Sequence, residues 1–248
     1  MSRWRRHVCI PDTQVRAGVS TKHLVAAGNY IAEKAPDVVV HLGDHWDLPS
    51  LNSHGKKIEI EGKRIQQDIE VGNEALALLT TIIRGRKGYN PRLVLLRGNH
   101  EERLNRAIGD DPRLDGLVGS QSFNDRALGW EVHDFLNVVP IDGILYSHYF
   151  YAPLTGRPYG GDARYKLGRI HRSFTQGHVQ GISTAQLEVP GGKRIRGLVC
   201  GSFYSHDESY KGPQANNHWR GIVVKNEVRE GDYDATEVSL GYLLRRYA

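Results

Sequence analysis

Short buried strands alternate with amphipathic helices through the first hundred residues, and this order limits the folds open to the chain. Runs rich in Val, Ile and Leu that predict strands are residues 7–10, 37–44 and 92–99. Between them, one helical pattern begins near Ser20, with Ser20 or Thr21 as its cap, and a second spans residues 63–84. Strand, helix, strand, helix, strand predicts right-handed crossovers and a largely parallel sheet.

After residue 100 the pattern changes to short strand-like runs separated by glycines. A hairpin is predicted over residues 137–148 around Asp142-Gly143, and Gly191-Gly192 predicts a second hairpin. Further strand-like runs are residues 172–179, 183–189, 194–203, 220–225 and 236–244. Neither a repeat nor a linker divides the chain, so we expect one α/β domain over residues 1–248.

Composition excludes several classes of protein. Hydrophobic residues make up 39% and charged residues 25% of the chain, as in soluble globular domains. The two cysteines, Cys9 and Cys200, lie in apolar runs, which excludes a disulfide scaffold and a cysteine-based zinc site. No apolar run approaches the roughly 18 residues of a membrane helix, and the N-terminal stretch turns polar too early for a signal peptide. We therefore expect a cytoplasmic protein without a membrane partner.

Polar residues that bind metals in other proteins follow several predicted strands. They are Asp12 and Gln14, then Asp44 and Asp47, then Asn99 and His100, and later His148, His178 and Gln180. Ligands of open α/β sheets bind where strand carboxyl ends meet loops, so these groups are expected to converge. Taken singly, a Gly-Asp pair is usually a turn and a lone histidine is usually a core residue. The ordered set is more specific, and its mixture of hard oxygen ligands and imidazole suits Mn²⁺, Mg²⁺, Fe or Zn²⁺.

The ordered set resembles the motifs of the calcineurin-like metallophosphoesterase superfamily over about residues 7–180. The family pattern is DxH, GDxxD, GNH(D/E), a lone H and GHxH, and small phage and bacterial DNA-repair-exonuclease-like enzymes are among its members. The resemblance implies a two-sheet β-sandwich flanked by helices, with two divalent metal ions at the strand ends. It places the protein inside a bacterial or phage-infected cell.

The same resemblance assigns the metal ligands by position. Asp44 would bridge both metals, and Asp12 would bind the first. Asn99, His148 and His178 would complete the second site. A metal-activated hydroxide would then attack the phosphorus of the substrate.

The resemblance also implies catalytic roles, and the sequence departs from the family pattern at two positions. His100 would act as general acid or stabilise the transition state, and Asp47 would hold its ring. The family has His at the positions of Gln14 and Gln180, and both of those histidines bind the first metal. Amide oxygens favour Mn²⁺, so the first site is either weak and oxygen-rich, or empty in a mononuclear enzyme.

A basic stretch with interleaved tyrosines separates His148 from His178. We interpret Arg164, Lys166 and Arg169 as substrate contacts, because basic and aromatic groups together suit phosphates and stacked bases. The alternative is a solvated loop with tyrosines packed beneath it. The net charge of +5 permits an anionic partner without requiring one.

These features favour a phosphodiesterase that acts on nucleic acid. Two alternatives stay open: a phosphomonoesterase of nucleotides or phosphoproteins, and a binding module on the same fold. GDHWDLPS lacks the GDxxDRG continuation of protein Ser/Thr phosphatases, which disfavours the phosphoprotein reading. Residues 181–248 carry no recognised motif and are expected to close the second sheet rather than border the site. The sequence identifies no protein partner.

Overall fold

Two β-sheets form the centre of the molecule. The computed structural model describes residues 4–52, 62–207 and 216–248. The first sheet consists of β1 (Arg5–Ile10), β2 (Val38–His41), β3 (Arg92–Leu96), β4 (Glu131–His133), β10 (Gly221–Arg229) and β11 (Asp232–Ser239). The second sheet consists of β5 (Val139–Ile141), β6 (Ile144–Ser147), β7 (Phe174–Gln176), β8 (Ile182–Val189) and β9 (Lys193–Cys200).

Strand directions place several carboxyl ends at the same edge. The order in the first sheet is β11-β10-β1-β2-β3-β4, with β1 to β4 parallel and β10 and β11 antiparallel to their neighbours. The order in the second sheet is β5-β6-β7-β9-β8, with β6, β7 and β9 parallel. The parallel core predicted for the N-terminal half is therefore confirmed.

Alternating side chains on the first sheet are buried on both faces. Val39 of β2 packs in one core cluster with the helices, whereas Val38 and Val40 pack in another cluster that includes residues of the second sheet. Leu95 and Val94 of β3 divide in the same way. Successive side chains of a strand point to opposite faces of the sheet, and here both faces are covered. Side chains on both faces of such a strand are therefore buried, which explains the continuous apolar runs in the sequence.

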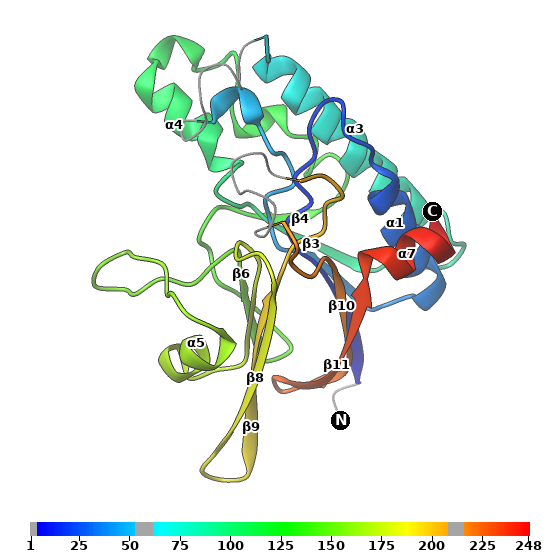
Figure 1. The fold of residues 1–248 in the computed structure, drawn as a ribbon, viewed down its shortest axis with the longest axis vertical. Helices are drawn as coiled ribbons and strands as arrows, with labels where there is room; N and C mark the ends of the chain where they lie inside the picture. Colours follow the sequence, from blue (N-terminus) through cyan, green and yellow to red (C-terminus); the bar gives the residue numbers. More distant parts are fainter. Residues whose placement is uncertain (1–3, 53–61, 208–215) are drawn as a thin grey trace.

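Helices cover the outer faces of both sheets. They are α1 (Lys22–Lys34), α3 (Ile65–Arg84), α4 (Glu102–Asp110), α5 (Ala163–Ile170) and α7 (Leu240–Tyr247), with 3₁₀ turns η1 (Pro49–Leu51), η2 (Pro112–Leu114) and η3 (Ser120–Ser122). In Figure 1, α5 lies outside β8 and β9, while α1, α3 and α7 lie on the side of the first sheet. A separate apolar cluster of Phe150, Leu167 and Phe174 joins α5 to the second sheet. The expected two-sheet sandwich flanked by helices is confirmed.

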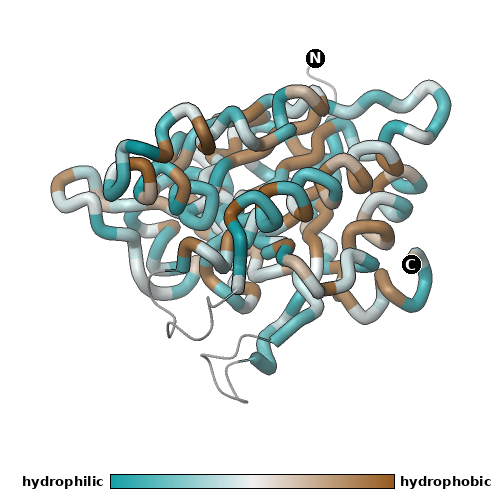
Figure 2. The backbone as a smooth tube through the Cα atoms, turned by 90° about the horizontal axis from the view of Figure 1, so that it is seen from above, coloured by the Kyte–Doolittle hydropathy of each residue, from teal (hydrophilic) through white to brown (hydrophobic). Residues whose placement is uncertain are grey.

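Hydropathy follows this layering. Seen from above in Figure 2, hydrophobic stretches run through the middle of the molecule, and helical turns alternate between hydrophobic and hydrophilic residues. No helix among the described residues is long and apolar enough to cross a membrane.

The C-terminal segment departs from its prediction in two ways. The run 236–244 was expected to be extended throughout, but β11 ends at Ser239, whose Oγ accepts the Tyr242 N–H at 3.2 Å and caps α7. Residues 181–248 were also expected to close the second sheet, but they contribute to both sheets. β8 and β9 belong to the second sheet, whereas β10 and β11 extend the first sheet beside β1. The two predicted hairpins, β5–β6 and β8–β9, are confirmed.

Candidate metal centre

A continuous chain of contacts joins five of the predicted ligands. The main-chain N–H of His178 donates to Asp12 Oδ1 at 3.0 Å, and His178 Nδ1 lies 2.8 Å from Asn99 Oδ1. His148 Nε2 lies 2.9 Å from the same Asn99 oxygen and 3.4 Å from Asp44 Oδ2. All five follow strands whose carboxyl ends share one edge, so strand direction alone brings together residues far apart in sequence.

Asn99, His148 and His178, which we call the asparagine half, hold one another through side chains. Both imidazoles converge on Asn99 Oδ1, and His148 Nδ1 donates to the Leu42 carbonyl at 2.7 Å. That carbonyl fixes the ring so that Nε2 faces the centre, as outer hydrogen bonds do for metal-binding histidines. Ligand atoms of Asp44, His148 and His178 lie within 4.8 Å of one another.

Asp44 sits at a tight turn that its neighbours define. Its backbone has φ of +50°, and its Oδ1 accepts the His100 N–H at 2.9 Å. A Cβ at Gly98 would lie 2.1 Å from Asp44 Oδ1, so only glycine allows the two loops to approach this closely.

Charge is concentrated in this cluster. Burial would lower the pKa of His148, but the carboxylates of Asp44 and Asp12 outweigh it and raise the pKa to about 9. Burial and then His148 lower the pKa of His178 to about 4. Burial, followed by the charge of Asp44, raises the pKa of Asp12 to about 7. Such opposed shifts in one small cluster are common at functional sites.

His100 is held on both sides of its ring. Its Nδ1 lies 3.0 Å from Asp47 Oδ1, and Arg103 Nη2 lies 3.0 Å from its Nε2. A guanidinium can only donate, so this contact suits a neutral ring that accepts at Nε2. Burial lowers the pKa of His100, but the carboxylates of Asp44 and Asp47 outweigh it and raise that pKa, which favours a ring protonated on both nitrogens. Asp47 and Arg103 therefore contact opposite nitrogens of the His100 ring.

Asp12, Gln14 and Gln180, which we call the glutamine half, differ from the asparagine half. The Oε1 atoms of Gln14 and Gln180 are both buried, and among the described residues neither has a hydrogen-bond partner. Buried carbonyl oxygens are normally bonded, so each of these two oxygens needs a hydrogen-bond donor or a cation. Together with the asparagine half they form a set of oxygen and imidazole donors, and this set fits divalent metal ions.

Three arginines near the centre were not singled out by sequence. Arg103 Nη1 also donates to the Asp47 carbonyl at 2.7 Å, and Arg16 Nη1 lies 3.3 Å from Asp47 Oδ2. Arg106 donates to the Asn99 carbonyl at 3.2 Å. The spacing of Arg103 and Arg106 after His100, one helical turn apart on α4, was the available signal.

The three expected substrate contacts on α5 differ in their exposure. Arg164 and Arg169 are exposed, and Arg169 lies over the ring of Tyr165, which is itself half exposed. Lys166 is buried, and its ammonium donates to the carbonyls of Tyr159 and Gly160. The interpretation of Lys166 as a substrate contact is wrong, because its side chain holds the preceding loop instead.

Residues 202–207 border the centre, contrary to expectation. The Phe203 N–H donates to the Asp12 carbonyl at 2.8 Å, and Arg16 Nη2 donates to the Asp207 carbonyl at 3.4 Å. Ser202 is fully buried and its Oγ lies 2.9 Å from His218 Nε2. The signal missed was the end of β9, a further parallel strand whose carboxyl end faces the same edge.

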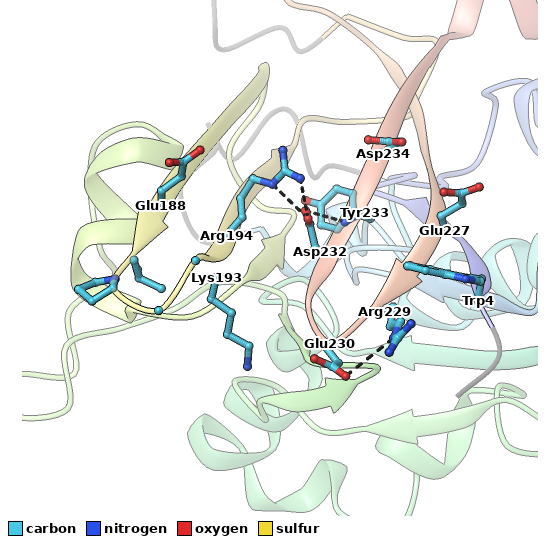
Figure 3. A pocket seen from close by; sticks show the side chains of 14 residues that line it. Trp4, Glu188, Lys193, Arg194, Glu227, Arg229, Glu230, Asp232, Tyr233 and Asp234 are labelled. Carbon is cyan, nitrogen blue, oxygen red and sulfur yellow. Dashed lines mark hydrogen bonds and ion pairs between the residues drawn. The ribbon is translucent and has the colours of Figure 1, made fainter. Parts of the chain in front are cut away.

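An open groove of about 830 Å³ lies at the opposite edge, between the β8–β9 and β10–β11 turns (Figure 3). Two pairs of its charged groups lie close together: Arg194 Nη2 lies 3.0 Å from Asp232 Oδ2, and Arg229 Nε lies 3.8 Å from Glu230 Oε1. Among the described residues, clustered metal-ligand side chains occur at the strand carboxyl ends, not in this groove.

Comparison with known proteins agrees with the geometry. A family model described as calcineurin-like phosphoesterase matches residues 8–184, which contain every proposed metal ligand. No curated protein matches the chain.

Proposed function

The chain belongs to the calcineurin-like phosphoesterase family and is a metal-dependent phosphoesterase, and from this premise we propose that it hydrolyses phosphodiester bonds in nucleic acid. The observation that carries hydrolysis is the cluster of Asp44, His148 and His178, with ligand atoms within 4.8 Å of one another and His100 beside it. Two buried free thiols, Cys9 and Cys200, fit the reducing cytoplasm.

Both halves of the centre would hold a divalent ion. Asp12, Gln14 and Gln180 would contribute to the first, and the asparagine half to the second, with Asp44 between them. When bound, the ions lower the pKa of a water and neutralise charge on phosphate oxygens. Because the glutamine half offers only oxygen donors, we propose Mn²⁺ as the preferred ion and the first site as the weaker one.

His100 would serve the leaving oxygen. Asp47 holds Nδ1 and orients the ring, which leaves Nε2 as the atom that can meet the substrate. In the structure the Arg103 guanidinium contacts His100 Nε2. A bound phosphoester would attract this guanidinium and so free Nε2 for the leaving oxygen. Arg16 contacts the Asp47 carboxylate and Arg106 the Asn99 carbonyl, and both would bind further phosphate oxygens.

Support for nucleic acid comes from the exposed surface of α5. Arg164 and Arg169 stand beside Tyr165, and α5 follows the loop that starts at His148. Exposed cations next to an aromatic ring bind backbone phosphates and stack on bases without sequence preference.

The test compares three substrates with added Mn²⁺: bis-p-nitrophenyl phosphate, p-nitrophenyl phosphate and single-stranded DNA. We expect hydrolysis of the diester and of DNA. Cleavage of the monoester alone would make the protein a phosphomonoesterase. Mn²⁺ binding without hydrolysis of any of the three would favour the binding module.

A further inference from the structure

Glu101 is buried, and its carboxylate accepts four main-chain N–H groups. Oε1 accepts from His45 at 2.6 Å and from Trp46 at 3.1 Å, and Oε2 accepts from Gly98 at 2.6 Å and from Asp44 at 3.1 Å. The side chain is 3% exposed, and no ion pair joins it to a cation in the part of the chain that the structure describes. The four N–H groups occupy both oxygens of the side chain, so neither oxygen is free for another ligand.

The four donors belong to two separate loops. Asp44, His45 and Trp46 follow β2, while Gly98 follows β3, and these loops carry Asp44 and Asn99. β2 ends at His41, so the N–H groups of residues 44–46 lie beyond the hydrogen bonds that β2 makes with β1 and β3. A buried N–H without a partner is costly, and Glu101 satisfies three in succession.

Hydrogen bonds between the two loops are donated from both sides. Glu101 accepts the Asp44 N–H, and Asp44 Oδ1 accepts the N–H of His100. This pair of bonds holds Asp44 in its left-handed conformation and fixes its carboxylate relative to the neighbouring loop. Glu101 is the N-cap residue directly before α4, but its side chain makes no bond to that helix's own N–H groups.

We propose that Glu101 is a positioning residue that sets the spacing of the two metal-binding loops. It does not bind metal itself, because both oxygens are fully engaged with the backbone. The inference deepens the proposed function, and it rests on that function only for the part of the test that measures metal binding.

The test replaces Glu101 with Gln, which keeps the size but turns an NH₂ group toward two N–H donors. Glu102→Gln is the matched control, because the Glu102 carboxylate accepts an exposed hydrogen bond from Asn105 and accepts no main-chain N–H group among the described residues. In metal-free protein we expect amide hydrogen exchange at residues 44–46 and 98 to be at least about tenfold faster in Glu101→Gln. Exchange in α3 and α7 should not change, which separates positioning from a general loss of structure.

Metal affinity is the second readout. Loss of an outer contact typically weakens metal binding about 10–100-fold, so the Mn²⁺ dissociation constant of Glu101→Gln should rise by that factor. Glu101→Asp keeps the carboxylate and should recover part of the affinity; it replaces Glu101→Gln in both measurements if the latter does not fold.

The outcomes are distinguishable. Exchange at the four amides equal to that of Glu102→Gln overturns the positioning role. Unchanged Mn²⁺ affinity with faster exchange also overturns it, since the loops would then be spaced by other contacts. Wild-type protein that binds no Mn²⁺ contradicts the proposed function, while the exchange comparison still decides the role of Glu101.

Discussion

The two halves of the metal centre differ in how their buried polar groups are hydrogen-bonded. In the asparagine half, His148 and His178 both bond Asn99 Oδ1, so its side chains satisfy one another. In the glutamine half, the buried carbonyl oxygens of Gln14 and Gln180 have no partner among the described residues. The asparagine half is preorganised by its own contacts. The glutamine half keeps carbonyl oxygens whose hydrogen-bonding capacity a ligand or solvent would have to satisfy.

Removal of the residue shared by both halves should have the largest effect. Asp44→Asn loses the carboxylate between them, so we expect Mn²⁺ binding to be lost and turnover to fall on the order of 10³-fold or more. Titration of metal-free protein with Mn²⁺ and a diester assay measure both. Asp110→Asn, at the exposed end of α4, is the control. Retained binding in either half would show that the halves are independent.

His100 should separate chemistry from metal binding. His100→Asn is expected to lower turnover by about 10²–10⁴-fold, the usual contribution of a general acid, with Mn²⁺ still bound. Single-turnover rates at saturating Mn²⁺ check the first part and metal analysis the second. Loss of metal in this variant would assign His100 to the ligands instead.

Conversion of the glutamine half should make it resemble the family pattern. Gln14→His with Gln180→His supplies two imidazoles, so we expect first-site affinity for Zn²⁺ to rise about tenfold and the preference for Mn²⁺ to decrease. Binding curves for both ions, compared with wild type, provide the measurement. In wild type, full activity at one equivalent of Mn²⁺ without a second binding event would exclude the two-metal arrangement.

The smallest effect is expected outside the centre, on α5. Arg164→Glu with Arg169→Glu should weaken single-stranded DNA binding several-fold and flatten its salt dependence, since fewer counterions are released. Hydrolysis of a small diester should be nearly unchanged. Arg245→Glu with Arg246→Glu makes the same charge change on exposed residues of α7, on the other side of the sandwich. Equal losses in both variants would attribute the effect to net charge rather than to α5.

Sequence patterns predicted best what depends on neighbours along the chain. The buried strands, α1, α3 and both hairpins follow from local periodicity and turn residues. The run 236–244 failed because Ser239 caps a helix whose apolar residues pack on α1, a contact between chain ends that no local pattern encodes. Lys166 failed for a related reason, since a lysine in a basic stretch gives no indication that two carbonyls will bury it.

The sequence by itself determined which residues end each parallel strand and in what order, and hence that Asp12, Asp44, Asn99, His148 and His178 could meet. Only the tertiary structure decided how they are held. Glu101 bonding three successive amides of another loop, and Arg103 bonding His100, depend on the relative placement of loops in space. That placement follows from the register and packing of two sheets, which are set by contacts between residues distant in sequence.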